Sequence, residues 1–177
     1  MAERRYTAFL RGIYPGTATQ PELRRSFEAA VFADVSTVIA SGNVVFTARS
    51  ATPASLERKA EKAMQQELGR SFLTIVRSIE DMRVMLDADP YARFRLPADA
   101  KRVVTFIRDP GPTELELPMK ERDGARILAA TEGEIFSAYV PNPKGGVFMN
   151  VIEDALGEAV TTRTWDTAKK VVARGEA

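Results

Sequence analysis

The chain has 177 residues and a formal net charge of +1, with 45% hydrophobic and 28% charged residues. This length suits one large domain or two small ones, with a core that needs no metal or disulfide staple. Cysteine and histidine are both absent, which excludes disulfides, zinc–thiolate sites and the Ser-His-Asp and Cys-His catalytic groups. The near-zero net charge disfavours direct nucleic-acid binding.

The first half of the sequence predicts the order strand, helix, two strands, helix and strand. The predicted strands cover residues 6–13, 35–39, 44–47 and 72–76, and the predicted helices cover 20–32 and 53–68. Thr52-Pro53 and Gly69 are typical of a helix start and a helix end. Gly42 and Asn43 tolerate the positive φ angles of a tight reversal and predict a hairpin. This order is the split β-α-β arrangement of ferredoxin-like folds.

The second half predicts a similar order. Its predicted elements are a helix capped by Ser78, a strand at 101–107, a short helix at 112–119, a hairpin of 125–130 with 135–140 around Glu132-Gly133, a helix at 147–156 and a last helix capped by Thr162 or Thr164 that runs to about residue 174. We therefore expect an α+β protein of two ferredoxin-like halves that share a core, with antiparallel or mixed sheets. The expected halves are 1–90 and 91–177, or a single domain over the whole chain.

No targeting or metal-binding pattern stands out. The N-terminal apolar stretch at 6–10 is too short for a signal peptide or a membrane span, so a cytoplasmic location without membrane contact is expected. The paired carboxylates Asp87-Ala88-Asp89 and Glu153-Asp154 are too sparse to predict a cation site. We expect no metal and no cofactor.

Three segments together resemble a known family. They are Phe9-Leu10-Arg11-Gly12-Ile13, Ser41-Gly42-Asn43-Val44-Val45-Phe46 and Thr161-Thr162-Arg163-Thr164-Trp165-Asp166-Thr167. Their residues and spacing are similar to those of the bacterial family catalogued as domain of unknown function 1697, along nearly the whole chain. The resemblance implies a cytosolic α+β fold built from ferredoxin-like units, and it implies no activity.

This chain departs from the family pattern at several polar positions. The family usually has Asn in place of Tyr14, Gly in place of Thr17 and Gln in place of Ala40, and it usually has Asn in place of both Thr164 and Asp166. Four side-chain amides, which both donate and accept hydrogen bonds, are thus missing. If these segments line one pocket in the family, this member binds a different ligand or none.

Arg11 and the predicted hairpin turn are the first candidate ligand site. Arg11 follows four strand residues and is a candidate anion clamp; the alternative is an arginine that hydrogen-bonds inside the protein, with the segment 161–166 as the expected partner. Ser41, Gly42 and Asn43 have backbone N–H groups that can hold an anion, although a purely structural turn explains them as well.

The start of the last predicted helix is the second candidate site. Thr162 and Arg163 would place hydroxyls and a cation where free N–H groups favour an anion. Trp165 could stack on a base, but Val171 and Val172 continue an apolar helix face beside it, so we expect its indole to be buried. The loop 142–146 carries two glycines and a lysine before a helix, without the spacing of a P-loop.

These residues favour a non-catalytic binding protein for a phosphate-bearing or nucleotide-like ligand. The candidate ligand-binding residues are Arg11, Ser41, Gly42, Asn43, Thr162, Arg163 and Trp165. One alternative is an enzyme that uses lysine, tyrosine or carboxylate chemistry without histidine or cysteine. A further alternative is a protein-interaction module.

Overall fold

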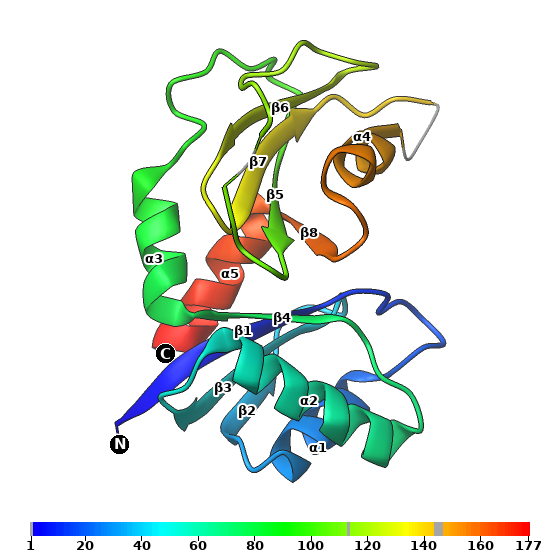
Figure 1. Ribbon diagram of the computed structural model, residues 1–177, viewed down its shortest axis with the longest axis vertical. Helices are drawn as coiled ribbons and strands as arrows, with labels where there is room; N and C mark the ends of the chain where they lie inside the picture. Colours follow the sequence, from blue (N-terminus) through cyan, green and yellow to red (C-terminus); the bar gives the residue numbers. More distant parts are fainter. Residues whose placement is uncertain (1, 113, 144–146) are drawn as a thin grey trace. The chain divides into compact units, whose positions relative to one another are not determined.

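The computed structural model describes residues 2–112, 114–143 and 147–177, and the chain divides into two compact units. The first unit comprises Met1–Asp87 with Thr167–Ala177, and the second comprises Ala88–Asp166. Each unit has a four-stranded antiparallel sheet, with strand orders β2-β3-β1-β4 and β6-β7-β5-β8 (Figure 1). The expected α+β class with two ferredoxin-like halves is confirmed. The boundary expected after residue 90 stays a prediction.

The first unit follows the predicted order of elements. They are β1 (Glu3–Leu10), α1 (Gln20–Ala29), β2 (Ala33–Thr37), β3 (Asn43–Arg49), α2 (Pro53–Leu68), β4 (Thr74–Ser78) and α3 (Ile79–Ala88). The hairpin of β2 with β3 is confirmed, and so are the caps of α2: the Thr52 hydroxyl accepts from the N–H of Ser55 at 3.2 Å, and Gly69 has φ 72°.

The strand boundaries of the first unit differ from the sequence prediction by one to three residues, and so does the end of α1. Two of these differences have a clear cause in the backbone. β1 ends at Leu10 rather than Ile13, because Gly12 turns the chain with a φ of 90°. α1 ends at Ala29 rather than Phe32, because Val31 has a left-handed φ of 64° that a helix cannot contain.

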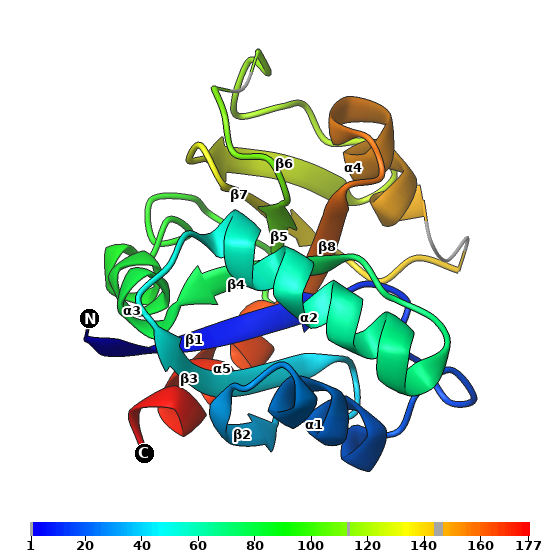
Figure 2. The ribbon, with the colours of Figure 1, turned by 60° about the horizontal axis from the view of Figure 1, so that its bottom comes forward.

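The core of the first unit lies between its sheet and helices α1 and α2. Figures 1 and 2 show both helices on the same face of this sheet. Leu23 and Phe27, four residues apart in α1, point into the core. There the Phe46 ring of β3 lies 5.5 Å from the Phe27 ring and 4.4 Å from the Phe32 ring, measured between centroids. The aromatic side chains thus fix the helices to the sheet.

Two carboxylates of α2 satisfy the free edge of β4. Val76 donates its backbone N–H to Glu57 Oε1 at 3.0 Å, and Thr74 donates its N–H to Glu61 Oε1 at 3.0 Å. Glu57 and Glu61 are four residues apart, so they lie on one side of the helix. The Glu57 side chain is buried, and hydrogen bonds to a charged acceptor are stronger than neutral ones. This end strand is therefore closed against pairing with another chain.

The second unit contains a shorter set of elements. They are β5 (Lys101–Ile107), β6 (Ala125–Ala130), β7 (Glu134–Tyr139), α4 (Val147–Leu156) and β8 (Val160–Thr164), followed by α5 (Trp165–Glu176), most of which groups with the first unit. The predicted hairpin around Glu132-Gly133 is confirmed by β6 and β7, which are joined at a hydrogen bond from the Thr131 N–H to the Glu134 carbonyl. α4 packs Ile152 against Ile127, Ile135 and Val160.

The short helix predicted at 112–119 is wrong, because the described part of this stretch contains no helix. Glu114 and Glu116 are exposed, whereas Leu117 and Met119 pack against the core under α4. This alternation with a period of two is typical of extended chain. The Met119 N–H donates to the Ile127 carbonyl at 2.9 Å, so the segment runs beside β6.

A second difference is the strand β8, which the sequence analysis missed. Thr162 lies inside this strand and does not cap the last helix: its hydroxyl is 2.8 Å from the Thr105 hydroxyl of β5. β8 has five residues, three of them threonines, and a helix follows at once. Because threonine is also a preferred N-cap residue, the sequence of this segment fits a helix start as well as a strand. Pairing with β5 decides between the two structures.

We predict that Glu57→Leu lowers the free energy of unfolding by about 1–3 kcal/mol, because it leaves the buried N–H of Val76 without an acceptor. Glu57→Gln keeps an acceptor oxygen and should cost less. Urea denaturation measures both. The matched control is Glu67→Leu on the exposed side of the same helix, and equal losses for Glu57→Leu and Glu67→Leu would contradict the role given to the carboxylate.

Candidate functional site

The structure brings Arg11 and the hairpin turn of the first unit together. The Leu10 N–H donates to the Gly42 carbonyl and the Arg11 N–H to the Leu73 carbonyl, both at 2.9 Å. Gly42 has φ 80°, and a Cβ there would lie 2.7 Å from Ile13 Cγ1. Only glycine fits this close approach.

The Asn43 side chain makes hydrogen bonds within this turn. Its side chain is 1% exposed, and Nδ2 donates to the Val38 carbonyl at 2.9 Å and to the Ser41 hydroxyl at 3.0 Å. The amide therefore holds the β2–β3 hairpin closed. Arg11 is half-buried and Ser41 exposed. Ligand binding by Arg11, Ser41, Gly42 and Asn43 stays a prediction.

Thr162, Arg163 and Trp165 lie in the second unit, whereas Arg11 and the hairpin turn lie in the first. Arg163 is 9% exposed in β8; its Nη1 donates to the Thr161 hydroxyl at 2.7 Å and to the Thr162 carbonyl at 2.9 Å. Burial lowers the pKa of Arg163 to about 10.

Trp165 is 4% exposed, and the predicted burial of its indole is confirmed. Its ring meets the rings of Tyr91 and Phe136 edge-on, at centroid distances of 5.0 Å and 6.2 Å. Arg163 and Trp165 therefore contribute to the interior of the second unit. Ligand contact by these residues, and an anion beside the start of α5, stay predictions. Residues 144–146 of the candidate loop at 142–146 lie outside the described residues.

Sequence reasoning missed a second set of arginines, which surrounds two aromatic rings in the second unit. Arg93 Cζ lies 5.0 Å and Arg126 Cζ 5.8 Å from the Phe94 ring centroid, and Arg102 Cζ lies 5.9 Å from that of Tyr91. These distances are within cation–π range. We call these five residues the arginine–aromatic cluster.

Backbone turns between α3 and β5 set the position of the cluster. The Ala92 N–H donates to the Asp89 carbonyl at 3.2 Å, and the Phe94 N–H donates to the Tyr91 carbonyl at 3.0 Å. Tyr91 anchors the loop: its ring is buried, and its hydroxyl donates to the Val103 carbonyl of β5. Burial raises the pKa of Tyr91 well above its usual value, although the nearby Arg102 opposes this effect.

A cavity of about 300 Å³ adjoins the cluster. Its lining includes Tyr91, Phe94 and Arg102, together with other residues of the loop between Tyr91 and Arg102. In the part of the chain that the structure describes, no carboxylate forms an ion pair with Arg93, Arg102 or Arg126. Toward the described residues, Arg126 donates a hydrogen bond only from Nε, to the Met119 carbonyl at 3.2 Å. Most of the guanidinium donors of the cluster are therefore available to an anion.

Part of this cluster can be recognised in the sequence as a run of alternating aromatic and basic residues. Tyr91-Ala-Arg93-Phe94-Arg95 interleaves aromatic and basic residues, and Lys101-Arg102 follows soon after, a pattern typical of sites for phosphate-bearing ligands. Arg126 comes from β6, a different part of the chain. Its place beside Phe94 depends on the fold.

Comparison with known proteins now identifies the family. Residues 4–136 match the family described as "Protein of unknown function (DUF1697)". The chain belongs to this family. The DUF1697 match includes the arginine–aromatic cluster, Arg11 and the Ser41–Asn43 turn, and it ends before the segment 161–167.

A solved structure has the same fold. The chain is 23% identical to the protein described as "conserved bacterial protein SP0830 from Streptococcus pneumoniae", with a TM-score of 0.70 over 99% of this chain and 100% of that one. No curated protein matches this DUF1697 member. Among the described residues, no helix is long and apolar enough to cross a membrane, and no three acidic side chains gather as a metal site would require.

We predict that Tyr91→Phe lowers the free energy of unfolding at pH 7 by about 0.5–1.5 kcal/mol, through loss of the hydrogen bond to Val103. Above about pH 10 an unfolded tyrosine releases its proton while folded Tyr91 retains it, so this residue makes the wild-type protein lose stability as pH rises. Urea denaturation at pH 7 and pH 10.5 tests both effects.

The variant should therefore lose less stability than the wild type between these pH values. Tyr14→Phe is the matched control, because Tyr14 is 62% exposed. An identical alkaline loss in wild type and Tyr91→Phe would refute the explanation.

Proposed function

We propose that this protein is a non-catalytic binding protein for a phosphate-bearing ligand, held at the arginine–aromatic cluster of the second unit. The observation that carries the proposal is the set of three guanidinium groups, Arg93, Arg102 and Arg126, around two aromatic rings beside a cavity of about 300 Å³, without a carboxylate partner among the described residues.

Phosphate is the anion that fits these groups best. A guanidinium is planar and permanently charged, and it can donate two parallel hydrogen bonds to phosphate oxygens. The half-buried Phe94 ring adds a flat apolar surface on which a base or sugar can stack. The cavity volume is at the small end of the range for ligand pockets, which favours a mononucleotide or a sugar phosphate.

The chemistry of the cluster supports binding rather than catalysis. The Tyr91 hydroxyl donates to the Val103 carbonyl, and burial raises the pKa of Tyr91. The Asp89 carboxylate of the same loop accepts the N–H of Tyr91 on Oδ1 at 3.3 Å. The cluster thus holds no group poised near neutral pH as a general base, and a preorganised set of donors is what a binding protein needs.

We predict that AMP, ATP or pyrophosphate binds the wild-type protein and that Arg102→Gln and Arg93→Gln each weaken this binding at least tenfold. The cause is the loss of a charge-assisted contact, and isothermal titration calorimetry measures it. The affinity should also fall as salt is raised, because the exposed charges are screened.

Two further variants sharpen the experiment. Arg70→Gln is the matched control, since Arg70 lies 4.7 Å from the Phe72 ring centroid as a single arginine–aromatic pair in the first unit. Arg11→Gln tests the site predicted from the sequence. No binding by any of these ligands, or equal losses in Arg70→Gln and Arg102→Gln, would reject the proposal; a selective loss in Arg11→Gln would move the site to the first unit.

A further inference from the structure

A pocket of about 250 Å³ lies in the second unit between α4 and the chain that leads into β6. Its floor is apolar and is formed by Met119, Ile127 and Val151. Ala125 and Ala155 also line it with small side chains, and the other lining residues are Lys120, Arg122 and Asp154. None of the described residues lines both this pocket and the cavity at the arginine–aromatic cluster.

Arg122 is held at the rim by a tight turn. The Arg122 N–H donates to the Ala125 carbonyl at 2.8 Å, and the Ala125 N–H donates back to Arg122 at 2.9 Å. Between them Asp123 and Gly124 have φ values of 50° and 80°, as in the two-residue hairpin turns that favour Asp-Gly. The turn therefore fixes the backbone of Arg122 beside the pocket.

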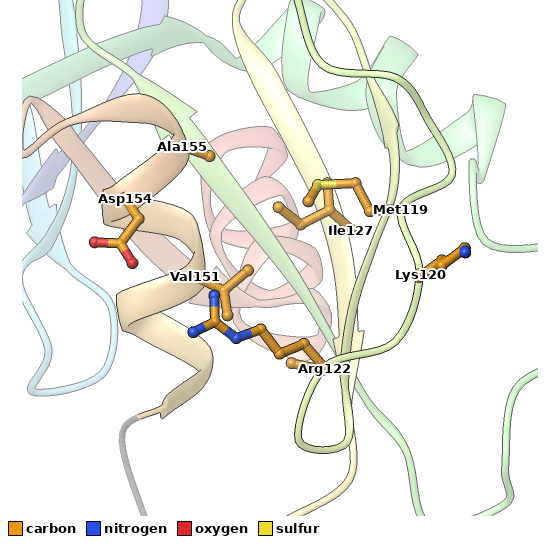
Figure 3. Close-up of a pocket in the computed structure, with 8 residues that line it drawn as sticks. Met119, Lys120, Arg122, Ile127, Val151, Asp154 and Ala155 are labelled. Atoms are coloured by element: carbon orange, nitrogen blue, oxygen red, sulfur yellow. The ribbon is translucent and has the colours of Figure 1, made fainter.

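Asp154 of α4 supplies the opposite charge. Figure 3 shows the Arg122 guanidinium and the Asp154 carboxylate on the same side of the pocket, with Val151 beside them, while Lys120 points away. Neither Arg122 nor Asp154 forms an ion pair with any residue that the structure describes. A cation and an anion thus stand unpaired at the rim of one apolar pocket.

We propose that this pocket binds a free amino acid with an aliphatic or thioether side chain, such as leucine or methionine. The ligand carboxylate would bind Arg122, its ammonium group would bind Asp154, and its side chain would lie on Met119, Ile127 and Val151. A ligand with both charges satisfies both rim groups at once, whereas a simple anion leaves Asp154 without a partner and an apolar molecule leaves both rim groups without one.

The size of the pocket agrees with this ligand class. Drug-sized ligands occupy pockets of roughly 300–1,000 Å³, and this pocket is slightly smaller. The apolar floor selects against glycine and charged amino acids, because a bare backbone leaves the floor unfilled and a charged side chain would lose its hydration there. The inference is independent of phosphate binding at the arginine–aromatic cluster.

Titration of the full chain with leucine and methionine, followed by calorimetry and by NMR shifts of the floor methyl groups, tests the proposal. Both amino acids should bind, glycine should not, and 4-methylpentanoate and 3-methylbutylamine, which each lack one charge, should bind at least tenfold more weakly than leucine. Absence of leucine binding at millimolar concentration would overturn the inference. Equal binding of 4-methylpentanoate would overturn the role of Asp154.

Four variants locate the site. Arg122→Gln and Asp154→Asn should each weaken leucine binding at least tenfold, and Ala155→Leu should abolish it by filling the pocket from the exposed side of α4. Lys120→Gln changes the charge as Arg122→Gln does, but it alters a side chain that points away, so it should bind as the wild type. Thermal melting checks that each variant folds. Leucine affinity that is unchanged in all four variants would place any bound amino acid elsewhere and reject this pocket.

Discussion

The outer backbone groups of an end strand in an antiparallel sheet must find partners, and the two units satisfy this constraint in different ways at β4 and at β6. In the first unit, Glu57 and Glu61 of α2 accept the free N–H groups of β4. In the second unit, the segment from Met119 to Arg122 runs alongside the end strand β6 and bonds to its backbone. A buried carboxylate in one unit and an added stretch of chain in the other thus both provide hydrogen-bond partners for the outer edge of an end strand.

This difference leaves room for a pocket beside α4 in the second unit. In the first unit two helices, α1 and α2, cover one face of the sheet. In the second unit the described residues between Ile107 and Ala125 contain no helix, and α4 covers its part of the face with the extended segment around Leu117 and Met119. An extended chain fills less volume than a helix, so a pocket remains between α4 and that segment.

Residues close together in the sequence were enough to predict most of the elements of the first unit. Thr52, Pro53 and Gly69 mark the two ends of α2, and Gly42 with Asn43 marks the hairpin, because caps and tight turns depend on residues within a few positions. Strand β8 and the extended segment before β6 were missed. Each acquires its structure by pairing with a distant strand, and that pairing leaves only a weak trace in composition.

The candidate site was harder to predict for the same reason. The sequence singled out Arg163 because it is close to a helix start, but β8 buries it among the threonine hydroxyl and carbonyl groups that accept its donors. Arg93, Arg102 and Arg126 look unremarkable one at a time, and they become a cluster only because β6, β5 and the loop before β5 converge on Phe94 and Tyr91.

An arginine's potential for binding depends on what already occupies its donors. The buried Arg163 has its pKa lowered to about 10, so the fold bears a cost to keep it charged, and its hydrogen bonds serve the sheet. Among the described residues, the exposed guanidinium of Arg102 contacts only an aromatic ring, which leaves its hydrogen-bond donors unused there. A net charge of +1 averages over both kinds of arginine, which is why a chain with no overall basic surplus can still present a local site for an anion.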